Sequence, residues 1–379
     1  MIDAITFSPS EPAGAFFWVF ALATAVTGLL VALTPYLMPK RECFAVTVPD
    51  AASSDPYLKG LKRRYLLWTV ALAVVALAAS TATYLAFGIG GYIAVFTVGL
   101  MALCVASFGL MLYFRAKVRA YKQQMGWTAT EQEHVALVGD EPMPHAISMK
   151  WDLLFLAIAG ITAVAAVICY PSMPDRIPMQ YDFNGQVSTW ADKSWATAAF
   201  PVLFVLFVGA VMAVSHWGIV HSKKASDPAA PVATAWAYGM FARAQSILMV
   251  ALGVMVGLLG PFMELSFAGT FTLQQLVIPI MAVALIAVVA SIAVGVVYGQ
   301  NGARLIARVQ RNAPLASDDD EHWKAGVFYV NRNDPSLFLP ERFGIGWTMN
   351  WGRPGAWVIV GMLVLVTAAF CIGSILMVG

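Results

Sequence analysis

Charged side chains are scarce in this sequence of 379 residues: they make up 12% of it, whereas 60% of the residues are hydrophobic. Soluble domains carry about 25% charged and about 45–50% apolar residues. This scarcity excludes an ordinary water-soluble globule and favours an integral membrane protein.

Cysteine is rare as well. The four cysteines, Cys43, Cys104, Cys169 and Cys371, form no CxxC pair, and three of them lie inside apolar runs. We expect them to pack as small side chains and not to form a disulfide framework. No Lys or Arg precedes the first apolar run. The positive region of a secretory signal is therefore missing, and we expect that run to be retained as a span.

Motifs for nucleotide binding, acyl transfer and metal catalysis are missing from the sequence. It contains no Walker-type GxxxxGK followed by Ser or Thr and no GxSxG, and its five histidines show no HExxH or other metal-ligand spacing. We therefore expect no catalytic residue, no metal and no cofactor, and we interpret the protein as non-enzymatic.

Long hydrophobic runs dominate the sequence. A helix that crosses the bilayer core needs about 20 mostly apolar residues. Eight stretches qualify: 14–37, 66–87, 92–114, 153–170, 196–217, 241–262, 276–298 and 356–378. The fold class that follows is an all-α polytopic membrane protein with about eight transmembrane helices.

The basic residues are segregated along this pattern. Apart from Arg176, Lys193 and Arg243, all of the 23 Lys and Arg residues fall in alternate connections, on one side of the membrane. The positive-inside rule makes this side cytoplasmic. We therefore expect a multi-pass cell-membrane protein whose N-terminus, C-terminus and loop 171–195 lie outside.

Ionisable residues are nearly absent from the spans. No Asp or Glu lies inside any of the eight spans, and the nearest, Asp152 and Glu264, are placed at helix ends, so the carboxylate relays of proton-coupled transporters are missing. Arg243 and Gln245 are intramembrane polar residues. They either line a polar cavity between helices or, in the interpretation we favour, reach the interface with snorkelling side chains.

The loop 171–195 is the longest outer connection. Ile177, Met179, Tyr181 and Phe183 alternate with polar residues or proline, as in a strand, and Asn184-Gly185 favours a type I′ turn. A short outer β-hairpin is the prediction. Its candidate ligand-binding residues are Pro174, Asp175, Arg176, Pro178, Gln180, Asp182, Asn184, Gly185, Trp190 and Lys193.

The residues leave two interpretations of this hairpin open. It is either a lid whose apolar face covers the bundle, or a recognition surface for something that arrives from outside, since binding residues are often carried on loops held by a rigid scaffold. The residues by themselves favour the lid.

The run 173–178, Met-Pro-Asp-Arg-Ile-Pro, followed by Asn184-Gly185, Trp190 and Lys193, resembles the loop signature of the domain of unknown function 1648 (DUF1648), shared with the SdpI-type immunity proteins of bacteria. The resemblance extends over about residues 152–298. It implies a bacterial membrane protein with an immunity or envelope-sensing role. The histidine usual in that strand is Gln180 here, so no role of that histidine transfers.

A second unusual segment, 323–354, lies on the cytoplasmic side. Residues 327–330 and 337–339 favour strands around a turn, which predicts a small hairpin. Residues 42–48 are a further strand candidate, and we hypothesise one small cytoplasmic sheet that joins these segments. The acidic block 318–321 is interpreted as a solvated linker.

Residues 338–350 resemble the element of another uncharacterised family, the domain of unknown function 5808 (DUF5808). We interpret this element as the contact for a cytoplasmic partner, such as a regulator. Its candidate residues are Arg342, Phe343, Gly344, Gly346, Trp347 and Asn350.

Three regions follow: 1–151, an N-terminal three-span region with basic cytoplasmic loops; 152–300, the SdpI-like four-span region with the outer loop; and 301–379, the DUF5808-like element with the last span. We expect an immunity or signal-sensing protein that meets the lipid bilayer, an extracellular peptide toxin or envelope signal, and a cytoplasmic regulator, with no direct contact to nucleic acid. The alternative is a transporter of small molecules or lipids. A membrane enzyme that uses Asp175 and Asp182 is least favoured, because their odd separation puts them on opposite faces of a strand.

Overall fold

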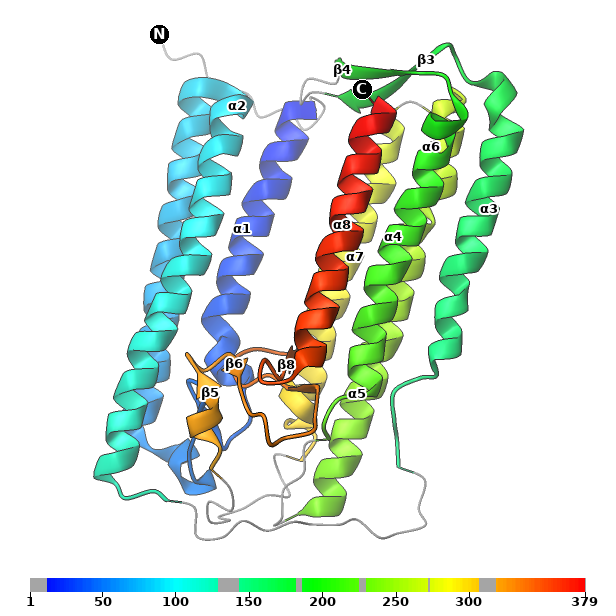
Figure 1. Cartoon of the computed structure of the whole chain (residues 1–379). Coiled ribbons are helices and arrows are strands. Elements are labelled where there is room, and N and C mark those ends of the chain that lie inside the picture. Colours follow the sequence, from blue (N-terminus) through cyan, green and yellow to red (C-terminus); the bar gives the residue numbers. More distant parts are fainter. Residues whose placement is uncertain are drawn as a thin grey trace.

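The chain folds into a bundle of helices with small β-hairpins at both ends (Figure 1). This computed structural model describes residues 12–128, 143–181, 186–224, 230–271, 273–306 and 318–378. The helices are α1 (Pro12–Leu37), α2 (Pro56–Gln124), α3 (Leu153–Cys169), α4 (Trp195–Val220), α5 (Pro231–Gly257), α6 (Leu259–Phe267), α7 (Leu273–Tyr298) and α8 (Pro354–Val378). Short 3-10 helices cover Asp50–Ser54, Met149–Asp152, Tyr170–Ser172, Gln300–Gly302 and Asp320–His322.

The described strands form four antiparallel pairs. At one end of the bundle, which we call the hairpin end, β3 (Arg176–Tyr181) pairs with β4 (Val187–Asp192). The opposite end, which we call the basic end, carries the other three pairs. These are β1 (Glu42–Cys43) with β2 (Val46–Thr47), β5 (Trp323–Lys324) with β6 (Phe328–Tyr329), and β7 (Phe338–Pro340) with β8 (Trp347–Met349).

The longest helix, α2, crosses the bundle twice. Its 69 residues would span about 100 Å as one straight helix, which is about three times the thickness of a bilayer core. Gly88, at φ 70° and ψ −160°, breaks the helix, and the two arms run side by side in Figure 1. The described residues contain seven helices long and apolar enough to cross a membrane. With α2 counted twice, the prediction of about eight transmembrane helices is confirmed.

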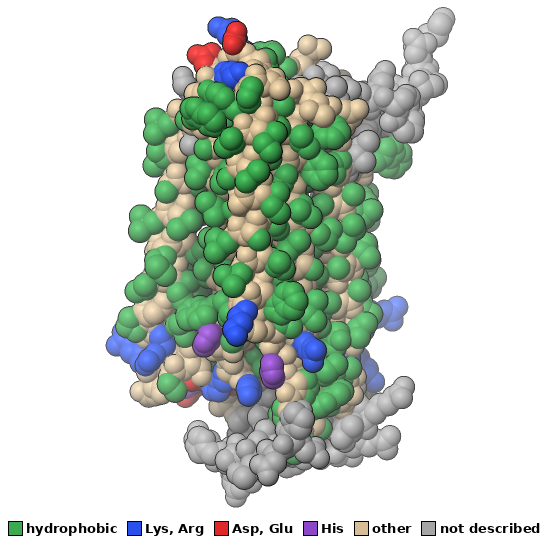
Figure 2. Space-filling model, turned by 90° about the vertical axis from the view of Figure 1, so that its right-hand side faces the viewer, with side chains coloured by type: hydrophobic (Ala, Val, Ile, Leu, Met, Phe, Trp, Pro, Cys, Tyr) green, Lys and Arg blue, Asp and Glu red, His purple; other side chains and the backbone are tan. Residues whose placement is uncertain are grey.

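Large apolar side chains cover the outside of the helices. Leu67, Val105, Ile168 and Leu365 are all more than half exposed, and Figure 2 shows hydrophobic side chains over the middle of the visible face, with most of the visible Lys and Arg toward the basic end. Lipid is the solvent that such a surface requires, and helices are the elements that satisfy their backbone polar groups within it. The chain is a multi-pass membrane protein.

Close helix contacts depend on small residues, as is typical of membrane bundles. Helix α4 packs against α3, α5, α6 and α8. A Cβ atom added at Gly209 of α4 would lie 2.8 Å from the Phe155 Cβ of α3, and one at Gly253 of α5 would lie 2.6 Å from the Phe155 ring. A side chain at either glycine would force these helices apart.

The strands at the basic end differ from the single sheet that we expected. Residues 327–330 and 337–339 do not pair with each other, because β6 pairs back onto β5 and β7 pairs forward onto β8. Residues 42–48 form a hairpin of their own, since Phe44 and Ala45, at φ 48° and 58°, turn the chain between β1 and β2. Each strand closes the nearest loop, which costs the least entropy. An isolated backbone bridge between Tyr329 and Asn350 and several side chains join the separate pairs.

Candidate functional site

The predicted hairpin is present and lies across the helix ends (Figure 1). Ile177 of β3 pairs with Ala191 of β4, and both are buried. Ile177 packs with Cys169 of α3 and Phe267 of α6 in one apolar cluster. One face of the hairpin therefore closes the bundle, as the lid interpretation predicts, and the other face is left open.

The open face carries most of the predicted ligand-binding residues. Pro174, Asp175, Arg176, Gln180 and Trp190 are exposed, and Pro178 is half-buried. Gln180 Oε1 accepts a 3.1 Å hydrogen bond from the Thr189 hydroxyl. The register between β3 and β4 is irregular on both sides of Gln180. The predicted turn residues Asp182, Asn184 and Gly185 lie outside the described residues. The exposed charged, amide and aromatic side chains form a surface that another molecule can contact.

Lys193 holds the base of the hairpin together. Its ammonium group donates a 2.8 Å hydrogen bond to the Met173 carbonyl and lies 5.1 Å from the centre of the Tyr170 ring. Its backbone N–H donates to the Asp175 carbonyl at 2.8 Å. Tyr170 in turn stacks on Trp195, the first residue of α4, with ring centres 3.9 Å apart. The predicted site residue Lys193 therefore fixes the base of the hairpin to the segment that follows α3, where Tyr170 packs on α4.

Glu264 is the main feature that sequence reasoning missed. It lies in α6, one turn before Phe267, and is fully buried. Among the described residues neither carboxyl oxygen has a hydrogen-bond partner. The sequence placed Glu264 at a helix end, but α6 continues α5 after a break at Leu258 and carries Glu264 into the bundle, beneath the hairpin. A buried acid without a partner is a functional candidate, because such groups are costly to keep.

Helix α4 connects the hairpin to the strands at the basic end. Ser194 caps its first turn by accepting a 3.1 Å hydrogen bond from the Thr197 N–H, two residues after β4 ends. Beyond its other end, the Lys223 N–H donates to the Phe338 carbonyl of β7 at 2.8 Å, and the Lys223 ammonium lies 2.7 Å from an Asp334 oxygen. The hairpin is therefore connected to β7 through α4 and through the hydrogen bonds of the residues that follow α4.

A second helix, α8, also connects the two ends of the bundle. Helix α8 begins at Pro354, just after β8, and returns to the hairpin end, where it contacts β4. In Figure 1, α8 and α4 run side by side between the two ends.

His216, fully buried in α4, hydrogen bonds to Asp152 at 2.9 Å and to the Ile147 carbonyl at 3.1 Å, which fixes the start of α3 against α4.

A network of charges joins distant segments at the basic end. Asp320 lies 2.7 Å from the Lys122 ammonium of α2, accepts a 3.0 Å hydrogen bond from the Thr47 N–H of β2, and pairs with Arg342. Arg342 also pairs with Asp319, and Lys122 lies 2.6 Å from Asp318. The interpretation of this acidic block as a solvated linker was wrong. The block binds basic side chains that lie about 20 to 200 residues away, a spacing that sequence periodicity does not reveal.

The pKa values of this network follow from its burial and charge. Burial alone would raise the pKa of Asp320, but the charges of Arg342 and Lys122 lower it to about 2. Burial raises the pKa of Glu42 to about 8, against the attraction of Arg342. Among the described residues, Glu42 Oε2 has no hydrogen-bond partner. Arg342 therefore compensates the aspartates well and Glu42 incompletely.

The other predicted residues at the basic end are also used within the chain. Asn350 is fully buried and donates to three backbone carbonyls, those of Asn331, Asp334 and Ser336. Gly346 exchanges two 2.9 Å hydrogen bonds with the buried Gln300 side chain, and both Gly344 and Gly346 have positive φ. Phe343 packs near Phe44, and Trp347 stacks on Phe241 of α5 with ring centres 5.2 Å apart.

The intramembrane polar residues Arg243 and Gln245 do not come together at a cavity. Arg243 is exposed and Gln245 is half-buried, and neither lines the cavity that lies between α4 and α5. Arg243 fits the snorkelling interpretation. Within the described ranges, no group of three or more His, Cys, Asp or Glu side chains is arranged to hold a metal ion.

Comparisons with known proteins match the two segments that α4 connects. Residues 157–205 match the Domain of unknown function (DUF1648), and residues 332–357 match the Family of unknown function (DUF5808). The first match covers most of α3, the hairpin and the first part of α4, which is shorter than the range 152–298 that we expected. No curated protein and no solved structure matches the chain. The chain thus carries both predicted elements, a DUF1648 segment at the hairpin end and a DUF5808 segment at the basic end.

Proposed function

We propose that this membrane protein is a non-enzymatic receptor of the immunity or envelope-sensing type, which recognises a peptide at the hairpin and transmits its presence to the basic end. The observation that carries the proposal is the position of α4. Only two residues separate this helix from β4, and the segment after the helix is hydrogen-bonded to β7. The proposed ligand surface on the hairpin and the strands at the basic end are therefore parts of one connected unit.

The orientation belongs to the same proposal. The Lys and Arg residues of the connecting segments lie mostly at the basic end, and the positive-inside rule places such an end in the cytoplasm. The hairpin end would then face the outside of a bacterial cell, where a peptide toxin or an envelope signal arrives. The DUF5808 segment would face a cytoplasmic regulator.

The chemistry of the open hairpin face supports a peptide ligand. Arg176 and Asp192 offer charges of both signs, 3.9 Å apart and 77% and 92% exposed. Trp190 is 49% exposed beside them. Trp and Arg are the residue types that most often dominate protein and peptide interfaces. The buried face, with Ile177, supplies the rigid support that such a surface needs.

The test is protection of a peptide-sensitive bacterial strain that expresses the chain, measured as inhibitory concentration over a panel of purified membrane-active bacteriocins. We expect protection against at least one, and a loss of about thirty-fold in Trp190→Ala, the effect of removing an interface anchor worth about 2 kcal/mol. Thr270→Ala, an exposed change at the same end, is the matched control. No protection against any peptide, at normal expression, would overturn the proposal.

Transport is the alternative function, and Glu264 is the observation in its favour. A buried acid without a partner can bind a proton or a cation on its way through a bundle. Arg243 gives transport no support, because its side chain lies at the exposed surface and does not line the cavity between α4 and α5. Cation- or proton-driven flux in proteoliposomes, lost in Glu264→Gln, would favour transport over reception.

A further inference from the structure

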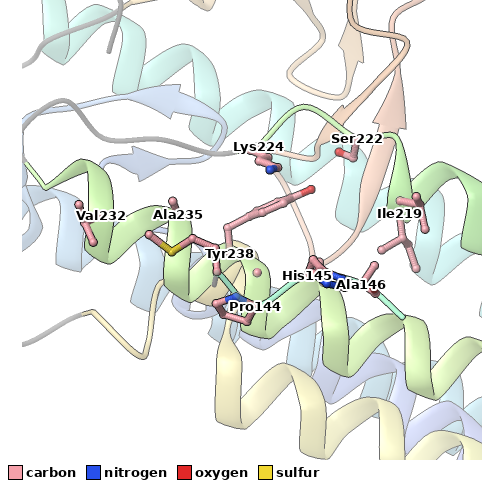
Figure 3. Close-up of a pocket in the computed structure, with 13 residues that line it drawn as sticks. Pro144, His145, Ala146, Ile219, Ser222, Lys224, Val232, Ala235 and Tyr238 are labelled. Carbon is pink, nitrogen blue, oxygen red and sulfur yellow. Dashed lines mark hydrogen bonds between the residues drawn. The ribbon is translucent and has the colours of Figure 1, made fainter. Parts of the chain in front are cut away.

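A cavity of about 400 Å³ lies at the basic end between α4 and α5. Its walls are the end of α4 and the residues after it, from Ile219 to Lys224, and the first three turns of α5, from Val232 to Ala242. The segment 143–146, which precedes α3, forms a third wall (Figure 3). This volume is at the lower end of the range for ligand pockets, about 300–1,000 Å³. It can hold a headgroup and the start of a chain.

The polar groups of the cavity suit an anion. Lys224 and His145 are the basic side chains of its lining, and no Asp or Glu is among the described residues that line it. The neighbouring Lys223 is paired with Asp334, whereas Lys224 forms no ion pair within the described part of the chain. The amide groups at the start of α5, where Ala230 offers no side-chain cap, add positive partial charge next to Val232.

Two hydroxyl groups complete this polar side. Figure 3 shows the Tyr238 ring reaching across the cavity, with its hydroxyl toward Ser222 and Lys224. The Ser222 hydroxyl donates a 3.4 Å hydrogen bond to the Lys223 carbonyl, and the Tyr238 hydroxyl accepts one of 3.2 Å from Trp347. Ser222 and Tyr238 are both buried, so an anion that entered would meet two positioned hydroxyl groups and a cation.

The apolar side of the cavity faces lipid. Val220 and Val232 line the cavity and are 39% and 55% exposed on the helix surfaces. Trp236, on the same stretch of α5, is 45% exposed, and tryptophan favours the membrane interface. The occupant that matches both sides is an amphiphile, with an anionic group near Lys224 and an acyl chain along the valines.

We propose that this cavity binds the phosphate headgroup of an anionic phospholipid from the leaflet that meets the basic end. Basic pockets between membrane helices are known to hold such headgroups. The proposal goes beyond the receptor function and does not depend on it, because it uses neither the hairpin nor an external peptide.

Occupation of the cavity would stabilise the DUF5808 segment. Trp347 donates a 3.2 Å hydrogen bond to the Tyr238 hydroxyl, and Trp347 packs on the apolar cluster of Ile219, Tyr238 and Ala242. All three of these cluster residues also line the cavity. A ligand that binds the folded chain raises its unfolding temperature by mass action, and here the bound lipid would add contacts next to Trp347.

The experiment uses the full chain purified in a neutral detergent, with lipid binding followed by native mass spectrometry and by the unfolding temperature. The probes are phosphatidylglycerol, phosphatidylcholine, glycerol phosphate and inorganic phosphate. We expect phosphatidylglycerol to bind and to raise the unfolding temperature, and the other three probes to bind much more weakly. Lys224→Ala should weaken phosphatidylglycerol binding about five-fold, the share of one basic residue near an anionic surface.

Two further variants keep the test sharp. Lys59→Ala removes an exposed cation at the basic end, away from the cavity, and should bind phosphatidylglycerol like the parent chain. Ala235→Phe fills the cavity without a change of charge and should abolish binding. Equal binding of phosphatidylcholine, or of glycerol phosphate without an acyl chain, would overturn the proposal, as would unchanged binding in both Lys224→Ala and Ala235→Phe.

Discussion

The two ends of the bundle use charge in opposite ways. At the hairpin end, the Arg176 and Asp192 side chains are 77% and 92% exposed and 3.9 Å apart. At the basic end, the paired side chains of Arg342 and Asp320 are 8% and 13% exposed. Exposed pairs contribute about 0–1 kcal/mol to stability, whereas a broken buried pair leaves an uncompensated charge. The buried paired charges of the basic end are therefore structural, and the exposed pair of the hairpin end is available to another molecule.

The range of the contacts differs as well. The polar contacts of Lys193 join residues within one loop, between Pro171 and Lys193. Arg115, buried in the second arm of α2, instead donates to the backbone carbonyls of Ala45 and Trp323, which are far apart in the sequence. The basic end gathers three distant segments into one platform. A receptor needs both a surface that is open to its ligand and a platform that keeps one arrangement until the ligand binds.

The largest effect that this comparison predicts is the loss of Arg342. In Arg342→Ala the buried carboxylate of Asp320 loses its main counter-charge, and Asp319 loses its partner. We expect the free energy of unfolding to fall by about 3–5 kcal/mol, the usual result of removing one partner of a buried pair. The measurement is the unfolding midpoint of the purified chain in detergent.

The control for this variant is Arg332→Ala, which removes an exposed arginine at the same end and should change the midpoint very little. If the two variants had equal effects, the buried network would contribute no more than solvated charges, and the contrast between the two ends would be lost.

A smaller effect is predicted for the pH dependence of the basic end. Burial raises the pKa of Glu42 from an ordinary 4.5 to about 8. Between these values the unfolded chain has released the proton that the folded chain still holds, so a rise in pH favours unfolding. Stability should fall from about pH 5 to pH 8 and then level off. Glu341, whose pKa burial raises to about 7, contributes in nearly the same window.

Glu42→Gln removes the first of these two contributions. We expect the variant to lose about half of the decline in unfolding temperature between pH 5 and pH 8, because Glu341 remains. Asp320 acts in the opposite sense, since its lowered pKa of about 2 adds stability that is lost only below about pH 4. Glu321→Gln, with an 80% exposed side chain, is the control. An unchanged pH profile in Glu42→Gln would contradict a raised pKa of the Glu42 carboxyl.

Sequence patterns predicted the parts of this structure that depend on local periodicity. The apolar runs located the helices, and the alternation around Ile177 with its turn signal located the hairpin. The basic end was only partly predictable. Its strands have two or three residues, too few for a periodic signal. The pairing of Asp320 with Lys122 and Arg342 depends on how distant segments meet in space.

Glu264 shows a second limit of sequence reasoning. Hydropathy ended the span at residue 262, before this acid, but the structure continues as α6 to Phe267 and buries the carboxyl completely. The available signal was the apolar sequence that follows Glu264, from Leu265 to Phe267. An acidic side chain within such a stretch is either exposed at the surface or buried for a functional reason, and the sequence does not distinguish these two positions.

The smallest stability effect is predicted at the hairpin end, where the comparison is sharpest. Arg176→Ala removes an exposed partner of a 3.9 Å ion pair, so the free energy of unfolding should change by less than about 0.5 kcal/mol. The same unfolding midpoint in detergent measures it. Because the receptor proposal gives Arg176 a ligand contact, the variant should lose peptide protection while it keeps its stability. A midpoint lowered as far as in Arg342→Ala would mean that charges hold both ends alike, and that any loss of protection reports on folding and not on recognition.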